Sequence, residues 1–191
     1  MNLIDSKKSL KILMFSLLTS CFLFSNTAYS KELISGKGLN VGEKIPTFDL
    51  ENESHNIMKF NENFRGKALL LVVSNYCTKD MAGAWTIGTF YKYHKNKNFT
   101  YPTIFSRRCV PFYVPNAFVS QSAKSTAEQT RIPYFLMDWN EEIAMKFKAS
   151  KENAHIYVVD KKGTIRYKME LTTPLVSREE MESTLEKVLK E

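Results

Sequence analysis

The sequence predicts an α/β domain in which a central mixed β-sheet carries helices on both of its faces. Segments of strand length alternate with segments of helical periodicity along most of the chain, which is typical of a layered α/β architecture. Residues 68–74 form a continuous apolar run, as expected of a central strand that is covered on both sides. The chain then ends with a β-hairpin pattern, which adds an antiparallel strand pair to the sheet, and with an amphipathic helix.

Residues 1–30 have the pattern of a secretory signal peptide. Three lysines precede the apolar stretch 12–24, and the small residues at 28–30 suit cleavage by signal peptidase. The apolar stretch is shorter than the roughly 18 to 20 residues that a membrane-spanning helix needs, and no later stretch approaches that length. We therefore expect a soluble mature protein that begins near Lys31 and works in the periplasm or elsewhere outside the cytoplasm.

An alternative reading of the N-terminus is a lipoprotein signal. Residues 18–21 resemble a bacterial lipobox, in which Cys21 would carry the lipid. The apolar residues 22–24 continue past that cysteine, whereas a lipoprotein usually has a polar tether there. A cleaved signal peptide is therefore the favoured interpretation.

The mature chain is expected to hold one domain and to carry a mild positive charge. Residues 31–40, with two glycines and few apolar side chains, suggest a flexible leader, and residues 41–191 suffice for a single core. Without residues 1–30, which hold three Lys and one Asp, the 27 basic and 20 acidic residues become 24 and 19, a net charge of +5. For an exported protein this excludes nucleic acid as an expected partner.

The first half of the domain is predicted to contain a hairpin and a strand–helix–strand unit. Residues 47–50 and 56–60 are short strand patterns separated by a polar turn. The central strand 68–74 is followed by a helical pattern over 79–94 and by a strand over 101–106. This order implies two parallel neighbouring strands.

The second half continues the alternation. Residues 116–131 are a polar helical segment, either a mobile lid or a solvent-facing helix, and are followed by a strand at 134–138 and a helix at 140–148. Residues 155–160 and 164–168 flank a tight turn and form the hairpin.

The last helix is predicted from a capping box and an apolar stripe. Ser177 and Glu180 have the spacing at which each side chain bonds the other's unpaired backbone amide. Met181, Leu185 and Leu189 then lie on one face of the helix. This helix completes the layer on one face of the sheet.

Several segments resemble a known family. Residues 41–50 (VGEKIPTFDL), 64–67 (FRGK) and 158–165 (VVDKKGTI) resemble the redoxin and peroxiredoxin (AhpC/TSA-like) branch of the thioredoxin-like superfamily. Within it, residues 102–119 and 135–138 are also similar to the exported YtfJ-type proteins. The resemblance implies a thioredoxin-like fold for most of the domain and a site built around a cysteine.

Cys77 is the candidate nucleophile. It follows the central strand at the expected start of the helix 79–94, where unpaired amides and the helix dipole favour a thiolate. Ser74, three residues earlier, resembles the hydroxyl with which peroxiredoxins bind peroxide. The sequence departs from that family in having Leu70 in place of its proline and Ala154 in place of its arginine.

Cys109 is the natural partner of Cys77. A thioredoxin-type pair of adjacent cysteines is excluded, because Asp80 stands where the second cysteine belongs and Ala154 stands where a cis-proline would be. Cys109 follows the strand 101–106, at the sheet edge where α/β proteins build their sites. The preceding arginines, 107 and 108, are expected to favour a thiolate at Cys109 as well.

Two functions remain open at this point. The first is an exported thiol oxidoreductase or peroxiredoxin-like protein that acts on protein disulfides, thiols or peroxide through Cys77, Cys109 and Ser74. The second is a catalytically degenerate domain in which Cys77 and Cys109 form a structural disulfide, worth about 3 to 4 kcal/mol for a loop of about 33 residues, and which binds an envelope or secreted partner. Neither requires a cofactor, and the three scattered histidines have no metal-site spacing.

Overall fold

The structure is a computed structural model that describes residues 37–172 and 178–191. The predicted signal peptide, the first part of the predicted leader and Ser177 of the predicted capping box lie outside the described residues. No helix within the described ranges is long and apolar enough to cross a membrane.

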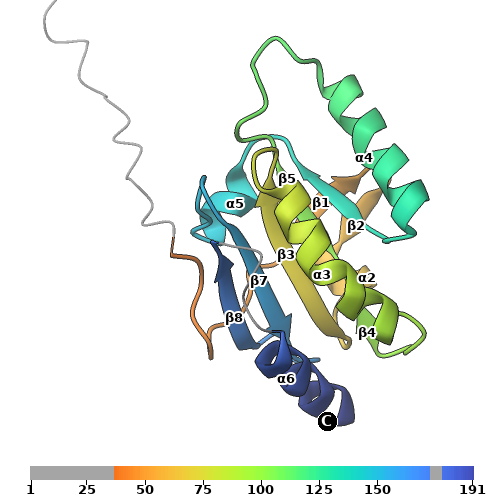
Figure 1. Cartoon of the computed structure of the whole chain (residues 1–191), viewed down its shortest axis with the longest axis vertical. Helices are drawn as coiled ribbons and strands as arrows, with labels where there is room; N and C mark the ends of the chain where they lie inside the picture. Colours follow the sequence, from red (N-terminus) through yellow and green to blue (C-terminus); the bar gives the residue numbers. More distant parts are fainter. Residues whose placement is uncertain (1–36, 173–177) are drawn as a thin grey trace, which may run out of the picture. The chain divides into compact units, whose positions relative to one another are not determined.

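The described residues form one mixed sheet of eight strands in the order β2-β1-β6-β5-β3-β7-β8, with β4 beside β3 (Figure 1). Strands β6, β5 and β3 are parallel neighbours, and the other pairs on this path are antiparallel. The predicted mixed sheet is therefore confirmed. The strands are β1 (Asp49–Asn52), β2 (Ile57–Lys59), β3 (Ala68–Asn75), β4 (Phe99–Thr100), β5 (Thr103–Ser106), β6 (Phe135–Asp138), β7 (Ala154–Val159) and β8 (Ile165–Leu171).

Helices cover both faces of this sheet, as predicted. Apolar side chains of α3 and α6 pack on one face, where α4 also lies, and those of α2 and α5 pack on the other. Figure 1 shows α3 lying along β3, with α6 beside it at the C-terminal end of the chain. The helices are α2 (Phe60–Asn63), α3 (Lys79–Tyr93), α4 (Asn116–Thr130), α5 (Glu142–Lys146) and α6 (Glu179–Lys190).

Strand β3 is the centre of the core, and every one of its residues is buried. Its side chains alternate between the two faces because successive residues of a strand point in opposite directions. Leu71 and Val73 join the cluster beneath α2 and α5, whereas Leu70 and Val72 join the cluster beneath α3 and α6. The same alternation places Ser74 on the α3 side.

The domain begins earlier than the predicted boundary at Val41. Lys37 forms a backbone bridge with Ala149, and Leu39 is buried in the core. The N–H of Leu39 donates to the hydroxyl of Tyr157 at 3.1 Å. Residues 37–40, assigned to the flexible leader by their composition, are therefore part of the fold.

The predicted strand 101–106 corresponds to β5, which begins at Thr103, and a separate short strand, β4, ends at Thr100 before Tyr101 and Pro102. Proline has no N–H to donate to a strand ladder, so an uninterrupted strand cannot pass through this position. The ladder resumes at Thr103, whose N–H donates to the carbonyl oxygen of Tyr134 at 3.0 Å.

Candidate functional site

The two candidate cysteines lie just beyond the ends of neighbouring parallel strands. In the β3–β5 ladder, Asn75 pairs with Ser106, the last residue of each strand. Just beyond the ladder the two segments remain joined, because the N–H of Tyr76 donates to the carbonyl oxygen of Arg108 at 3.3 Å. Cys77 and Cys109 are the next residues on the two chains, so the fold brings them to the same place.

Cys77 and Cys109 are both exposed and are not bonded to each other. Their side chains are close enough for Cys77 to shift the pKa of Cys109. Partial removal from water raises the pKa of the Cys109 thiol most, and its hydrogen bond to Cys77 and the negative charge of a Cys77 thiolate raise it further. The backbone N–H of Cys77 and the charge of Lys151 act in the opposite direction. The net effect is a raised pKa for the Cys109 thiol.

The arginines before Cys109 do not act as predicted from the sequence. The buried Arg108 guanidinium donates from Nε to a Glu141 carboxylate oxygen and from Nη1 to the carbonyl oxygen of Ala149, each at 2.9 Å. Arg107 donates from Nη2 to the carbonyl oxygen of Val114 at 2.6 Å. Both groups hold the loop in place, and the pKa of Cys109 is raised rather than lowered.

Asn75 fixes the loop that carries Cys77. Its side-chain oxygen accepts the N–H of Cys77 at 2.9 Å, and its side-chain nitrogen donates to the carbonyl oxygen of Lys151 at 2.9 Å. Its backbone N–H donates to the hydroxyl oxygen of Thr78 at 3.1 Å. The sequence analysis did not single out Asn75, although an Asn two residues before the nucleophile is the signature of an Asx turn.

The loop that carries Cys109 has an unusual backbone and an exposed aromatic tip. Cys109 has a φ of 67°, in the left-handed region that non-glycine residues seldom adopt and that is often found at functional sites. The N–H of Val110 donates to the carbonyl oxygen of Arg107 at 3.0 Å, which closes a turn around Cys109. Beyond it, Phe112 and Tyr113 are 91% and 73% exposed and contact each other edge to face.

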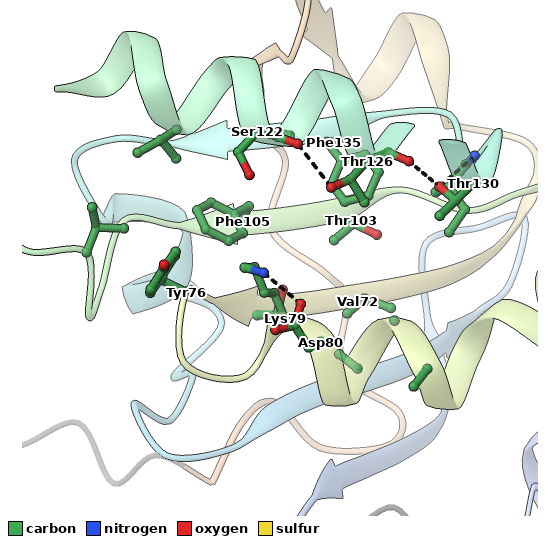
Figure 2. Close-up of a pocket in the computed structure, with 18 of the residues that line it drawn as sticks. Val72, Tyr76, Lys79, Asp80, Thr103, Phe105, Ser122, Thr126, Thr130 and Phe135 are labelled. Carbon is green, nitrogen blue, oxygen red and sulfur yellow. Dashed lines mark hydrogen bonds and ion pairs between the residues drawn. The ribbon is translucent and has the colours of Figure 1, made fainter. Parts of the chain in front are cut away.

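A cavity of about 660 Å³ opens beside the cysteine pair, between α3 and α4 (Figure 2). Its floor is formed by side chains of β3, β5 and β6, among them Val72, Thr103 and Phe105. Tyr76 and Val110, the direct neighbours of Cys77 and Cys109, line it, whereas the cysteines themselves do not. The cysteines therefore lie outside its wall, next to it along the chain.

Ser74 is one of the residues that line this cavity, and its hydroxyl is buried behind the surface. The residue is only 4% exposed, and its Oγ has no hydrogen-bond partner among the described residues. A buried hydroxyl without a partner costs free energy, so such groups are rare and often mark a place where another molecule binds.

Helix α4 forms the wall opposite α3. Ser122, Thr126 and Thr130, spaced four residues apart, face the cavity in Figure 2. The hydroxyls of Thr126 and Thr130 donate to carbonyl oxygens one turn earlier in their own helix, at 3.0 and 2.7 Å. The sequence left open whether residues 116–131 form a mobile lid or a solvent-facing helix. In the structure α4 lines a groove with some of its polar side chains.

The neighbouring positions on β7 carry no further reactive group. Ala154 is buried at the start of β7, and the peptide bonds of the described residues are all trans. His155 pairs with Val73 across the sheet and accepts the N–H of Ser150 at Nε2, at 2.8 Å. Across residues 37–172 and 178–191, no three His, Cys, Asp or Glu side chains gather as metal ligands do.

Solved structures identify the fold. A putative thiol:disulfide interchange protein DsbE from Chlorobium tepidum superposes with a TM-score of 0.61 at 16% identity, over 79% of this chain and 99% of that one. The fold is thioredoxin-like. A secreted Mycobacterium tuberculosis disulfide oxidoreductase superposes with a TM-score of 0.55 at 15% identity, over 73% of this chain and 95% of that one. A thiol peroxidase from Chromobacterium violaceum superposes with a TM-score of 0.54 at 12% identity, over 81% of this chain and 88% of that one.

These neighbours confirm the thioredoxin-like fold that the resemblance of the sequence motifs implied. No protein-family model matches the chain, and no curated protein matches it. At these identities the likeness establishes the fold, and the chemistry has to be argued from the residues of this chain.

Proposed function

We propose that this protein is an exported thioredoxin-fold thiol oxidoreductase in which Cys77 is the nucleophile and Cys109 the resolving thiol. The observation that carries the proposal is the contact between two exposed thiols at the ends of adjacent parallel strands. A bond between sulfurs at this place stays open to attack by thiols from solvent, which is what a disulfide that cycles requires.

The proposed reaction with a disulfide substrate proceeds in two exchanges. The Cys77 thiolate attacks one sulfur of the substrate, which breaks the substrate bond, releases one thiolate and leaves a mixed disulfide on Cys77. Cys109 then loses its proton and attacks the Cys77 sulfur, which releases the second substrate thiolate and forms the Cys77–Cys109 bond. The substrate gains two electrons and the protein loses two, and a dithiol donor reverses the change.

The raised pKa of Cys109 suits the resolving role. A raised pKa lowers the fraction of Cys109 that is present as the attacking thiolate, which suits a residue that acts second. Because the charge of a Cys77 thiolate is one cause of that raised pKa, its loss in the mixed disulfide makes Cys109 easier to ionise when it is needed.

Peroxide is a second candidate substrate, favoured by Ser74. Its unpartnered hydroxyl lies three residues before Cys77, where peroxiredoxins have a peroxide-binding hydroxyl. The Cys77 thiolate would attack one peroxide oxygen, release an alcohol or water and become a sulfenic acid, and Cys109 would then displace water from it. Ala154 supplies no arginine to polarise the peroxide, so we place disulfides first.

Export is part of the proposal. It is supported by the signal-peptide pattern of residues 1–30 and by the likeness of the fold to a protein described as secreted. In an oxidising compartment the Cys77–Cys109 pair would have disulfide partners available to it.

The test is reaction of the reduced, purified protein with a small symmetric disulfide such as hydroxyethyl disulfide. We expect one Cys77–Cys109 bond per chain and two equivalents of released thiol. Cys109→Ser should stop at a mixed disulfide on Cys77, and Cys77→Ser should react far more slowly. If both serine variants only lower stability and the native bond exchanges with nothing, the degenerate domain with a structural disulfide and an envelope or secreted partner is the correct account.

A further inference from the structure

The groove lies between α3 and α4 over the floor of the sheet, and its volume of about 660 Å³ is typical of a ligand site. Neither cysteine lines it, although their neighbours Tyr76 and Val110 do. A substrate joined to Cys77 through sulfur can therefore place an adjoining group in the groove at the same moment.

The groove is suited to an uncharged group. Its only charged side chains, Lys79 and Asp80, form an ion pair with each other at 2.6 Å. The hydroxyls of Thr126 and Thr130 are engaged within α4. Most of the other lining residues are apolar or aromatic, and those with hydroxyl groups, such as Thr103 and Ser122, carry no charge.

The rim of the groove extends the apolar surface outwards. Phe112, Tyr113, Phe118 and Tyr76 are 91%, 73%, 70% and 50% exposed, and all but Phe112 line the groove. Exposed aromatic residues clustered in this way are typical of protein interaction sites. A small molecule inside the groove would leave the 91% exposed Phe112 uncovered, whereas a polypeptide chain can cover the rim and fill the groove together.

From these observations we propose that the groove binds a polypeptide segment in which large apolar side chains adjoin a disulfide-bonded cysteine. The cysteine meets Cys77, and an adjoining apolar side chain enters the groove. This inference rests on the proposed function and deepens it, because it names the substrate class. The substrate is then an unfolded or extended chain, since apolar side chains next to a cystine are otherwise buried.

Gly83 provides a sharp way to close the groove. It lies on the groove-facing side of α3, and a Cβ added there would meet no atom within 4 Å. Gly83→Trp therefore fills the groove without a clash at the helix, whereas Gly83→Ala makes the same backbone change and leaves the groove open. Both changes replace a glycine in a helix interior and should not weaken the helix.

The test compares two peptide disulfides of equal length, one with Phe and Leu beside the cysteine and one with Ser and Gly, together with hydroxyethyl disulfide. We expect the apolar peptide to react about tenfold faster or more than the polar one, the size expected when one large apolar side chain leaves water. Gly83→Trp should abolish this preference and Gly83→Ala should keep it. Ile57→Ser, on the edge strand β2, removes a 60% exposed apolar residue and is the surface control.

The outcomes separate the inference from the proposed function. Equal rates for both peptides, unchanged by Gly83→Trp, overturn the groove and leave the oxidoreductase intact. If hydroxyethyl disulfide also fails to react, the proposed oxidoreductase function is wrong. Binding of the apolar peptide to the Cys77→Ser/Cys109→Ser protein then tests the groove by itself, and absence of binding overturns the inference. A concentration-dependent dimer that Gly83→Trp disrupts would assign the groove to a second copy and overturn the inference.

Discussion

The N–H of Tyr76 donates to the carbonyl oxygen of Arg108, just beyond the last pair of the β3–β5 ladder. Each of these residues directly precedes a cysteine. The bond therefore sets the distance between Cys77 and Cys109 from the backbone, independently of any bond between the sulfurs. A pair held in this way can open and close its disulfide while the strands beneath it stay in place.

The first prediction concerns the pH dependence of Cys109. Its pKa is raised, mainly by burial and then by Cys77, so at a given pH it carries less thiolate than an ordinary cysteine with a pKa of about 8.5. Alkylation follows the thiolate fraction. The initial rate of iodoacetamide reaction at Cys109, measured by peptide mass spectrometry, should therefore reach its midpoint above that pH.

Two variants should move this midpoint in opposite directions. Cys77→Ala removes the hydrogen bond and the negative charge that raise the pKa of Cys109, so the midpoint should fall. Lys151→Gln removes a positive charge that lowers this pKa, so the midpoint should rise. If neither variant shifts the pH midpoint of Cys109 alkylation, the two thiols do not interact.

The second prediction concerns Asn75. Asn75→Ala removes the acceptor for the N–H of Cys77 and the donor to Lys151, which should lower the free energy of unfolding by about 1 to 3 kcal/mol. Because the loop is then less ordered, reaction of Cys77 with disulfides should also slow. Urea unfolding and exchange rates measure the two effects.

Asn63→Ala is the matched control for Asn75→Ala. It removes a side-chain oxygen that accepts the N–H of Lys59 at 2.8 Å near α2. Exchange at Cys77 should be unaffected in that variant. Equal rates in Asn75→Ala and Asn63→Ala would show that Asn75 has no part in positioning the nucleophile.

The third prediction contrasts two buried hydroxyls. Ser74→Ala removes one that has no partner among the described residues, so the free energy of unfolding should stay the same or rise slightly. Thr86→Val removes one that donates to the carbonyl oxygen of Ala82 at 2.6 Å and contacts the hydroxyl of Tyr101, and should cost about 1 to 2 kcal/mol. A comparable loss in Ser74→Ala would mean that Ser74 is bonded within the protein.

Most of the fold was predictable because its core elements are encoded locally. The apolar run of β3 and the tight turn at Gly163, which has a φ of 79°, define their elements without tertiary information. The break at Pro102 was not anticipated, although the lack of an N–H explains it. Residues 37–40 were assigned to the leader because they include few apolar side chains, but the burial of Leu39 and the backbone bridge from Lys37 to Ala149 attach them to the domain.

The candidate site was predictable only in outline. The position of both cysteines beyond parallel strands follows from the order of the strands. Loop geometry decides three other features of the site, and it cannot be predicted from the periodicity of the sequence. These are the bond from Tyr76 to Arg108, the direction of the arginine side chains and the left-handed backbone of Cys109. The groove was not predicted, because the polar residues of α4 suggested a mobile lid or a solvent-facing helix, whereas some of them face a cavity.

The reduction potential of the Cys77–Cys109 pair tests the central claim most directly. The purified protein is equilibrated in glutathione and dithiothreitol buffers, and the two thiols are counted by alkylation and mass spectrometry. The account predicts a single two-electron transition above about −300 mV, in the range of disulfides that exchange. A bond that resists reduction below that potential, or two thiols that never form a bond in oxidising buffer, would contradict it.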